Sequence, residues 1–367
     1  QLQLDTFPFG ATFDPRVGNC AYTTLPSPTA GRIYLPTLGE GLDAQARNEW
    51  LCASGSELPG AVEVVSNRPV RGVVAPLAAD VERMRTLGTT WVGAIRSNTA
   101  LYGFPGALGS LQNAGVPIAL ATVWPVTGSM NLLRELACVD ELDARNHGNR
   151  FSDREQWLMA TANPARALAA DDSIGVLAPG RFGDVVVFDA RVRGGYRAVV
   201  GADVPDVVLV LRAGVPLHGD ASVVADLGGG DGACDVLDMC GRSKRVCASR
   251  LVGQTYAQLI AAAGAGTYPP FFCGTPAGEP SCVPARVAPN AGANFTGLPA
   301  PGDGDGDGVA DASDNCPASF NPIRLLDAGT QADADGDGIG DECDACALES
   351  GNQPCVTRIF GNGFEPS

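Results

Sequence analysis

Two acidic stretches near the carboxyl end of the chain have the side chains and the spacing that a cation site needs. Each is a twelve-position frame with aspartate at positions 1, 3, 5, 9 and 12 and glycine at position 6. Carboxylates packed this densely repel one another unless a cation neutralises them, and oxygen ligands in a flexible loop suit Ca²⁺, with position 7 lending its backbone carbonyl. The predicted ligands are Asp303, Asp305, Asp307, Val309, Asp311 and Asp314 in the first frame and Asp333, Asp335, Asp337, Ile339, Asp341 and Asp344 in the second.

The alternative interpretation of both stretches is an acidic, glycine-rich and disordered linker. Two matches to one frame favour calcium over that alternative. No amphipathic helix flanks either frame, so a pair of EF-hands is not expected. Position 12 is Asp rather than the bidentate Glu of an EF-hand, which shortens its reach and favours a different wrapping of the chain.

The residues around the two frames resemble those of a known family. The runs are Asp311-Ala-Ser-Asp314-Asn315-Cys316-Pro317, then Asn321-Pro322, then residues 335–344. They resemble thrombospondin type 3 repeats. That resemblance implies calcium wrapped by backbone and Asp side chains, little regular secondary structure, and a disulfide between Cys316 and Cys343. The spacer of residues 323–332 is longer than in that family.

The negative charge of the chain is concentrated in this segment. The net charge is -16 over 367 residues, and residues 299–348 hold twelve acidic side chains against one basic side chain. The acidity is therefore mostly a property of the predicted calcium loops. There is no basic patch of the kind that phosphate binding needs, so nucleic acid is not an expected partner. No apolar run reaches the length of a membrane span.

The cysteines and the two ends of the chain indicate export. The twelve cysteines are an even number, and most of them follow residue 230, which predicts disulfides and an oxidising compartment. The chain begins with Gln1 rather than Met, so we expect a processed chain whose leader has been removed. Residues 358–367 resemble the short endings of exported proteins from some Gram-negative bacteria. We expect a bacterial protein that is secreted, extracellular or on the cell surface.

In the first half of the chain, short apolar runs alternate with helical patterns, which predicts a parallel sheet or a barrel. The predicted strands are residues 32–38, 61–66, 70–75, 90–95 and 117–124, and the predicted helices are 43–54, 79–87 and 129–142. Ser129 is expected to cap the last of these helices. A capping box at Ser152 and Glu155 opens a further helix that Pro164 kinks or ends. Strands at 184–189 and 207–212 follow, with a hairpin that closes at His218.

This region also resembles a known family. Asn163-Pro-Ala-Arg-Ala-Leu, residues 175–189 and residues 207–217 resemble the C-terminal part of metal-dependent amidohydrolases, in which the last barrel helices give way to a small β-sandwich. Upstream, residues 38–41, 96–103 and 118–124 lie where that family has its later barrel strands. The resemblance covers residues 20–220. It implies a partial (β/α) barrel followed by sandwich strands.

The chain departs from that family at the positions of the metal ligands. Thr37 and either Arg71 or Gly72 stand where the family has histidines, and Val123 replaces an expected Asp. Since several His and one Asp hold the metal that activates water in that family, we predict that this chain cannot assemble the hydrolytic centre. The family's first strands are also missing from the sequence. We expect either a cleaved precursor or a companion chain that supplies them.

Four further polar residues are site candidates by their residue type. His147 and His218 are expected to be surface or hairpin residues rather than ligands. Glu40 and Asn98 persist at positions of the family and could line a polar pocket at strand ends. We expect a structural role for both.

The remaining cysteines predict how the later part of the chain is held. Cys20 and Cys52 are a plausible bridge, and Cys138 is expected to remain a buried thiol. Two local bridges and one longer bridge are expected to staple residues 222–298. The predicted α/β organisation is an amidohydrolase-like half-barrel at 1–175, β-sandwich strands at 176–221, a Cys-rich connector at 222–298, calcium repeats at 299–348 and a tail at 349–367.

Three functions follow as hypotheses. The favoured one is a secreted, Ca²⁺-binding structural or interaction protein on a degenerate amidohydrolase scaffold, extended by self-association into a filament. The second is an amidohydrolase acting on C–N bonds, whose missing half comes from an N-terminal companion chain. The third is a calcium-dependent adhesion module.

Overall fold

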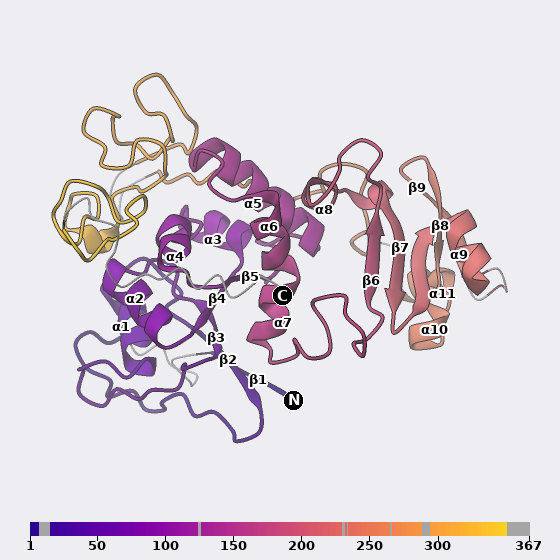
Figure 1. Cartoon of the computed structure of the whole chain (residues 1–367), viewed down its shortest axis with the longest axis horizontal. Coiled ribbons are helices and arrows are strands. Elements are labelled where there is room, and N and C mark those ends of the chain that lie inside the picture. The colour runs from indigo at the N-terminus through magenta and orange to yellow at the C-terminus, as the bar shows by residue number, and fades with distance from the viewer. Residues whose placement is uncertain are drawn as a thin grey trace.

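A computed structural model describes residues 1–6, 15–123, 126–229, 232, 234–264, 266–287 and 294–350 (Figure 1). The first half of the chain forms a five-stranded parallel sheet in the order β1-β2-β3-β4-β5. Its strands are β1 (Leu2–Thr6), β2 (Ile33–Leu38), β3 (Pro69–Gly72), β4 (Thr90–Gly93) and β5 (Ile118–Leu120). In the described part of the chain this sheet is open, with β1 and β5 at its ends, so the expected α/β fold is present without a closed barrel.

Helices connect and cover these strands. They are α1 (Ala44–Ala53), α2 (Ala78–Thr86), α3 (Ile95–Tyr102), α4 (Leu108–Ala114), α5 (Leu132–Asn146), α6 (Asp153–Ala160) and α7 (Ala162–Ala167). The core between sheet and helices is built around Trp50 and Trp91, which are 0% and 1% exposed. The predicted capping box is confirmed, since Ser152 and Glu155 bond each other's backbone at the start of α6.

Several details of the predicted elements were wrong. Residues 61–66 form no strand: Val62 and Val64 donate their N–H groups to the last turn of α1, so this backbone is satisfied by a helix end rather than by a sheet. Strand β1 was missed, although Leu2-Gln3-Leu4-Asp5 alternates between apolar and polar residues. Asn131, not Ser129, caps α5, because the Ser129 hydroxyl lies between Arg96 and Glu135.

Pro164 affects the chain before its own position. Helix α6 ends at Ala160, and α7 begins at Ala162 after Thr161, which has φ −129° and ψ −85°. A proline ring clashes with the carbonyl four residues earlier, here that of Ala160. The predicted end or kink is therefore confirmed, three residues upstream of the proline.

A second sheet of five antiparallel strands follows in the order β6-β7-β8-β10-β9. Its strands are β6 (Val185–Phe188), β7 (Val207–Arg212), β8 (Val215–Asp220), β9 (Asp235–Met239) and β10 (Arg242–Val246). The sheet therefore continues beyond residue 221, into the segment expected to be a connector. The β9–β10 hairpin turns through Cys240 and Gly241, both at positive φ, the geometry of a two-residue hairpin loop.

The short helical segments lie around this second sheet and beyond it (Figure 1). They are α8 (Arg197–Val200), α9 (Ala221–Val224), α10 (Ser249–Val252) and α11 (Tyr256–Ala263), with single turns at Val204–Asp206, Ala225–Gly229 and Leu325–Asp327. Helices α10 and α11 are separate because Gly253 takes a left-handed conformation after the end of α10.

Five disulfides join described cysteines. Cys20–Cys52 and Cys316–Cys343 are confirmed. Within the expected connector the two local bridges are Cys234–Cys247 and Cys240–Cys273. The longer bridge joins Cys282 to Cys138 on α5, so the prediction of a free thiol at Cys138 was wrong. The burial of Cys138 was expected correctly, but its partner lies 144 residues away and could not be found from local sequence.

Candidate metal centre

The two acidic frames fold as irregular loops that turn at pairs of glycines. Gly306 and Gly308 have φ of 78° and 90°, and the corresponding Gly336 and Gly338 have 75° and 93°. Such angles are strained for residues with a side chain. A Cβ on Gly308 would also lie 2.4 Å from the Asn294 carbonyl oxygen, so the first loop needs glycine for space as well.

The aspartate at position 1 folds each loop over itself. Asp303 accepts hydrogen bonds from the N–H groups of Gly306 at 2.8 Å and Gly308 at 3.1 Å. Asp333 does the same with Gly336 at 2.8 Å and Gly338 at 3.0 Å. The two loops therefore share one backbone geometry.

The aspartates at positions 9 and 12 close each loop in the same way. Asp311 accepts from the N–H of Gly304 at 2.7 Å, and Asp341 accepts from Ala334 at 2.8 Å. At position 12 the carboxylate accepts from the N–H two residues later, at 2.7 Å in both loops. Since this network repeats in detail, the regular spacing seen in the sequence corresponds to a repeated structure.

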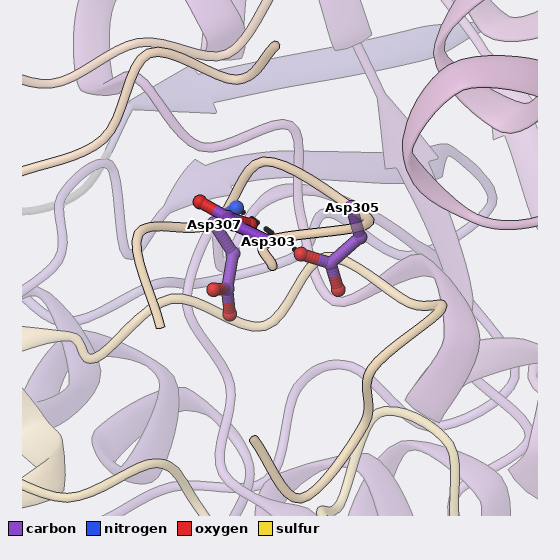
Figure 2. Close-up of side chains that lie close together, drawn as sticks. All are labelled: Asp303, Asp305 and Asp307. Atoms are coloured by element: carbon purple, nitrogen blue, oxygen red, sulfur yellow. Dashed lines mark hydrogen bonds between the residues drawn. The ribbon is translucent and has the colours of Figure 1, made fainter. Parts of the chain in front are cut away.

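Carboxylate oxygens converge inside each loop. Figure 2 shows Asp303, Asp305 and Asp307 gathered on one irregular segment, and one oxygen from each lies within 4.8 Å of the others. The same holds for the equivalent triplet that begins at Asp333. Positions 1, 3 and 5 are thus brought together in both loops.

Some of these oxygens are buried and have no hydrogen-bond partner. Asp305 is 1% exposed, and its Oδ2 atom accepts no hydrogen bond, nor does Oδ2 of Asp314 or of Asp335. A buried carboxylate oxygen without a partner is costly, and a cation would satisfy it. The residues present therefore fit a hard cation such as Ca²⁺, which takes six to eight oxygen ligands.

The electrostatics of the first loop favour the same ligand. Burial, followed by the charges of Asp307 and Asp314, raises the pKa of Asp305 to about 8. Burial also raises the pKa of Asp307 to about 6. Carboxylates in this environment resist ionisation on their own, because their like charges lie close together in a partly dry site. A divalent cation removes that penalty.

Gln331 contributes to the first loop, and the sequence reasoning missed it. Its Nε2 donates to Oδ2 of Asp307 at 2.9 Å and to Oδ1 of Asp314 at 2.8 Å. Gln331 lies in the spacer that is longer than in thrombospondin repeats, outside both frames. No spacing rule points to it, since the spacer must fold back before the amide reaches the loop.

The loops are packed against the α/β part of the molecule. Leu42, Val74 and Phe104, which follow β2, β3 and β4, form one buried cluster with Phe295 and Phe320. Figure 1 shows this late segment in orange and yellow beside α2 and α4. The connections that follow parallel strands hold the catalytic groups in barrel enzymes. Here the segment of the acidic loops covers part of the sheet edge at which the carboxyl ends of these strands lie.

The polar residues at this edge have protein partners. Glu40 pairs with Arg71 at 3.1 Å and accepts from the Tyr102 hydroxyl at 2.9 Å. Asn98 is buried and donates to the Pro105 carbonyl at 3.1 Å. Both fit the expected structural role. Thr37, which pairs with Arg71 in the β2–β3 register, lies at the same strand ends.

The two histidines lie in different parts of the molecule. His218 lies on β8 in the hairpin region, with Nδ1 3.1 Å from the Arg245 carbonyl. His147 was expected at the surface, but it is 3% exposed beneath Phe320, and burial lowers its pKa to about 3. The polar sequence around it suggested exposure, but the acidic-loop segment covers it.

Comparison with known proteins finds similarities in two parts of the chain. Residues 301–324 match the thrombospondin type 3 repeat family. No curated protein matches the chain. A zinc-bound adenosine deaminase from Xanthomonas campestris shares 20% identity over 50% of this chain and 45% of its own, with a TM-score of 0.43.

A triazine hydrolase from Arthrobacter aurescens gives 20% identity and a TM-score of 0.42, over 50% of this chain and 43% of its own. A zinc-complexed atrazine chlorohydrolase from the same species shares 21% identity, with a TM-score of 0.40. This match covers 50% of this chain and 44% of the hydrolase. The chain thus spans less than half the length of each of these structures. No helix among the described residues is long and apolar enough to cross a membrane.

Proposed function

We propose that this chain is an extracellular Ca²⁺-binding structural or interaction protein, with one calcium site in each acidic loop. The supporting observation is the repeated network that fixes the loop backbones while leaving buried carboxylate oxygens, such as Oδ2 of Asp305, without a partner. The match to thrombospondin type 3 repeats supports calcium independently. Five disulfides support an oxidising location outside the cytosol.

We propose as well that the α/β part serves as a scaffold rather than as a hydrolase. Arg71 neutralises Glu40, and Phe320 packs over the strand ends where a barrel enzyme would hold its reacting groups. The scaffold is expected to associate with further copies of itself. Support for association is β1, an end strand on which Leu2 and Leu4 are 45% and 65% exposed.

Equilibrium dialysis of the chelator-treated chain against Ca²⁺, with Mg²⁺ in excess, tests the calcium proposal. Saturable binding that Mg²⁺ does not suppress is the expected result, since flexible oxygen-rich loops favour the larger ion. Light scattering in Ca²⁺ and in chelator tests the association. Assemblies that dissolve on chelation are expected, and a small discrete particle under both conditions would exclude the polymer.

A further inference from the structure

We propose that calcium binding in the two loops is linked to the stability of the α/β part through two buried side chains, Glu342 and Asn146. This inference rests on the proposed calcium function and extends it. It assigns to these residues a positioning role, since neither belongs to the twelve predicted ligands.

Glu342 joins the second loop to α4. It lies next to Asp341, at position 9 of the loop, and its side chain points away from the loop into the α/β part. Its carboxylate accepts from the N–H of Gly109 and from the N–H and hydroxyl of Ser110, the latter at 2.9 Å. Asn113, further along α4, donates to the Asp344 carbonyl at 2.8 Å. The closing half of the second loop is thus bound along one helix.

Asn146 joins the first loop to α5. It is the last residue of that helix and is 0% exposed. Its Nδ2 donates to the carbonyl of Asp305 at 2.7 Å and to that of Gly297 at 2.9 Å. Its own carbonyl accepts from the N–H of Phe320 at 2.8 Å. Asp305, whose Oδ2 lacks a partner, is therefore held in place by a helix of the α/β part.

These contacts make the loops part of the fold of the α/β half. Without a cation, the repulsion among Asp303, Asp305 and Asp307 favours an open first loop. An open loop would withdraw the partner of Asn146 and uncover the cluster around Phe320. A ligand that binds only the folded state stabilises everything that unfolds together with its site. Calcium should therefore stabilise the sheet and helices and not the loops alone.

The tryptophans give a signal that separates the two parts. All four, at positions 50, 91, 124 and 157, lie in the first half of the chain, and Trp50 and Trp91 are buried in its core. Thermal unfolding followed by tryptophan fluorescence therefore reports the α/β part alone. At a calcium concentration about 100 times Kd, we expect its midpoint to rise by about 5–10 °C relative to chelator.

Two variants test the role of the anchors. Glu342→Gln and Asn146→Ala should lose at least half of the calcium-induced rise of the tryptophan midpoint, while calorimetry still detects bound Ca²⁺. The matched control is Glu141→Gln, an acid on α5 whose side chain is 57% exposed, which should keep the full rise.

The outcomes separate the inference from the proposed function. If calorimetry detects no Ca²⁺ binding to the wild-type chain, the proposed function fails. If wild-type Ca²⁺ binding is normal but the tryptophan midpoint does not move, the linkage is wrong. If a variant fails to fold, the tryptophan midpoint of the wild-type chain in Ca²⁺ and in chelator still tests the linkage.

Discussion

Gly109 and Glu342, which are 233 residues apart in sequence, are in direct contact at the start of α4. The N–H of Gly109 donates to Glu342 Oε1, and a Cβ on Gly109 would lie 2.2 Å from the Glu342 carbonyl oxygen. The acidic segment and the α/β part thus approach each other so closely that only glycine fits between them.

Gly109→Ala should therefore destabilise the chain by about 1–3 kcal/mol, the usual cost of forcing extra atoms into a packed interface. Urea unfolding measured in Ca²⁺ gives this value directly. Gly194→Ala is the control, because a Cβ at Gly194 meets nothing within 4 Å. Equal stability of the two variants would contradict the close docking of the acidic segment.

The bridge between Cys138 and Cys282 closes the longest loop of any disulfide among the described residues, with a separation of 144. Replacing both by Ala should lower the free energy of unfolding by about 4–5 kcal/mol, because the unfolded chain regains the entropy of that loop. Denaturant titration measures the loss. The double replacement of Cys234 and Cys247, which are 13 residues apart, should cost less. A larger loss of unfolding free energy for the Cys234 and Cys247 replacement would argue against the Cys138–Cys282 bridge.

The half-buried carboxyl of Glu49 predicts a dependence of stability on pH. Its Oε2 accepts from the N–H of Gly39, but burial, with the charges of Glu40 and Asp43, raises its pKa to about 7 from 4.5. Between pH 4.5 and pH about 7, the folded state therefore holds a proton on Glu49 that the unfolded state has released. The contribution of this group is fully present below pH about 4.5 and is lost as the pH rises to about 7.

Glu49→Gln should remove this loss, so that between pH 4.5 and pH 8 its free energy of unfolding falls by about 2–3 kcal/mol less than that of the wild type. Unfolding free energies at the two pH values, measured for both chains in constant Ca²⁺, provide the test. Asp171→Asn, at an exposed acid, is the control. A parallel pH profile for wild type and Glu49→Gln would show that Glu49 ionises normally.

The sequence predicted those parts of the molecule that local patterns determine. The acidic loops follow from ligand spacing and glycine positions, and most strands and helices of the α/β part follow from periodicity. Strand β1 was missed because its alternating run is only five residues long, and the β9–β10 hairpin because it carries charges where a buried strand has apolar residues.

The contacts that unite the two halves could not be predicted. In the sequence alone, Glu342 is one more acid in an acidic run, and Asn146 is a polar residue near the end of a predicted helix. Both become buried anchors only because segments about 160 to 230 residues apart pack together. His147 was likewise expected at the surface, because the segment that covers it is distant in sequence.

Calorimetric Ca²⁺ titration of the wild-type chain, Asp305→Asn and Asp335→Asn tests the central claim most directly. Each variant removes a position 3 carboxylate from one loop, so each should lose saturable binding at that loop and retain it at the other. Asp171→Asn should bind like wild type. If both loop variants bind Ca²⁺ as the wild type does, or if the wild type binds none at millimolar concentration, these loops are not calcium sites.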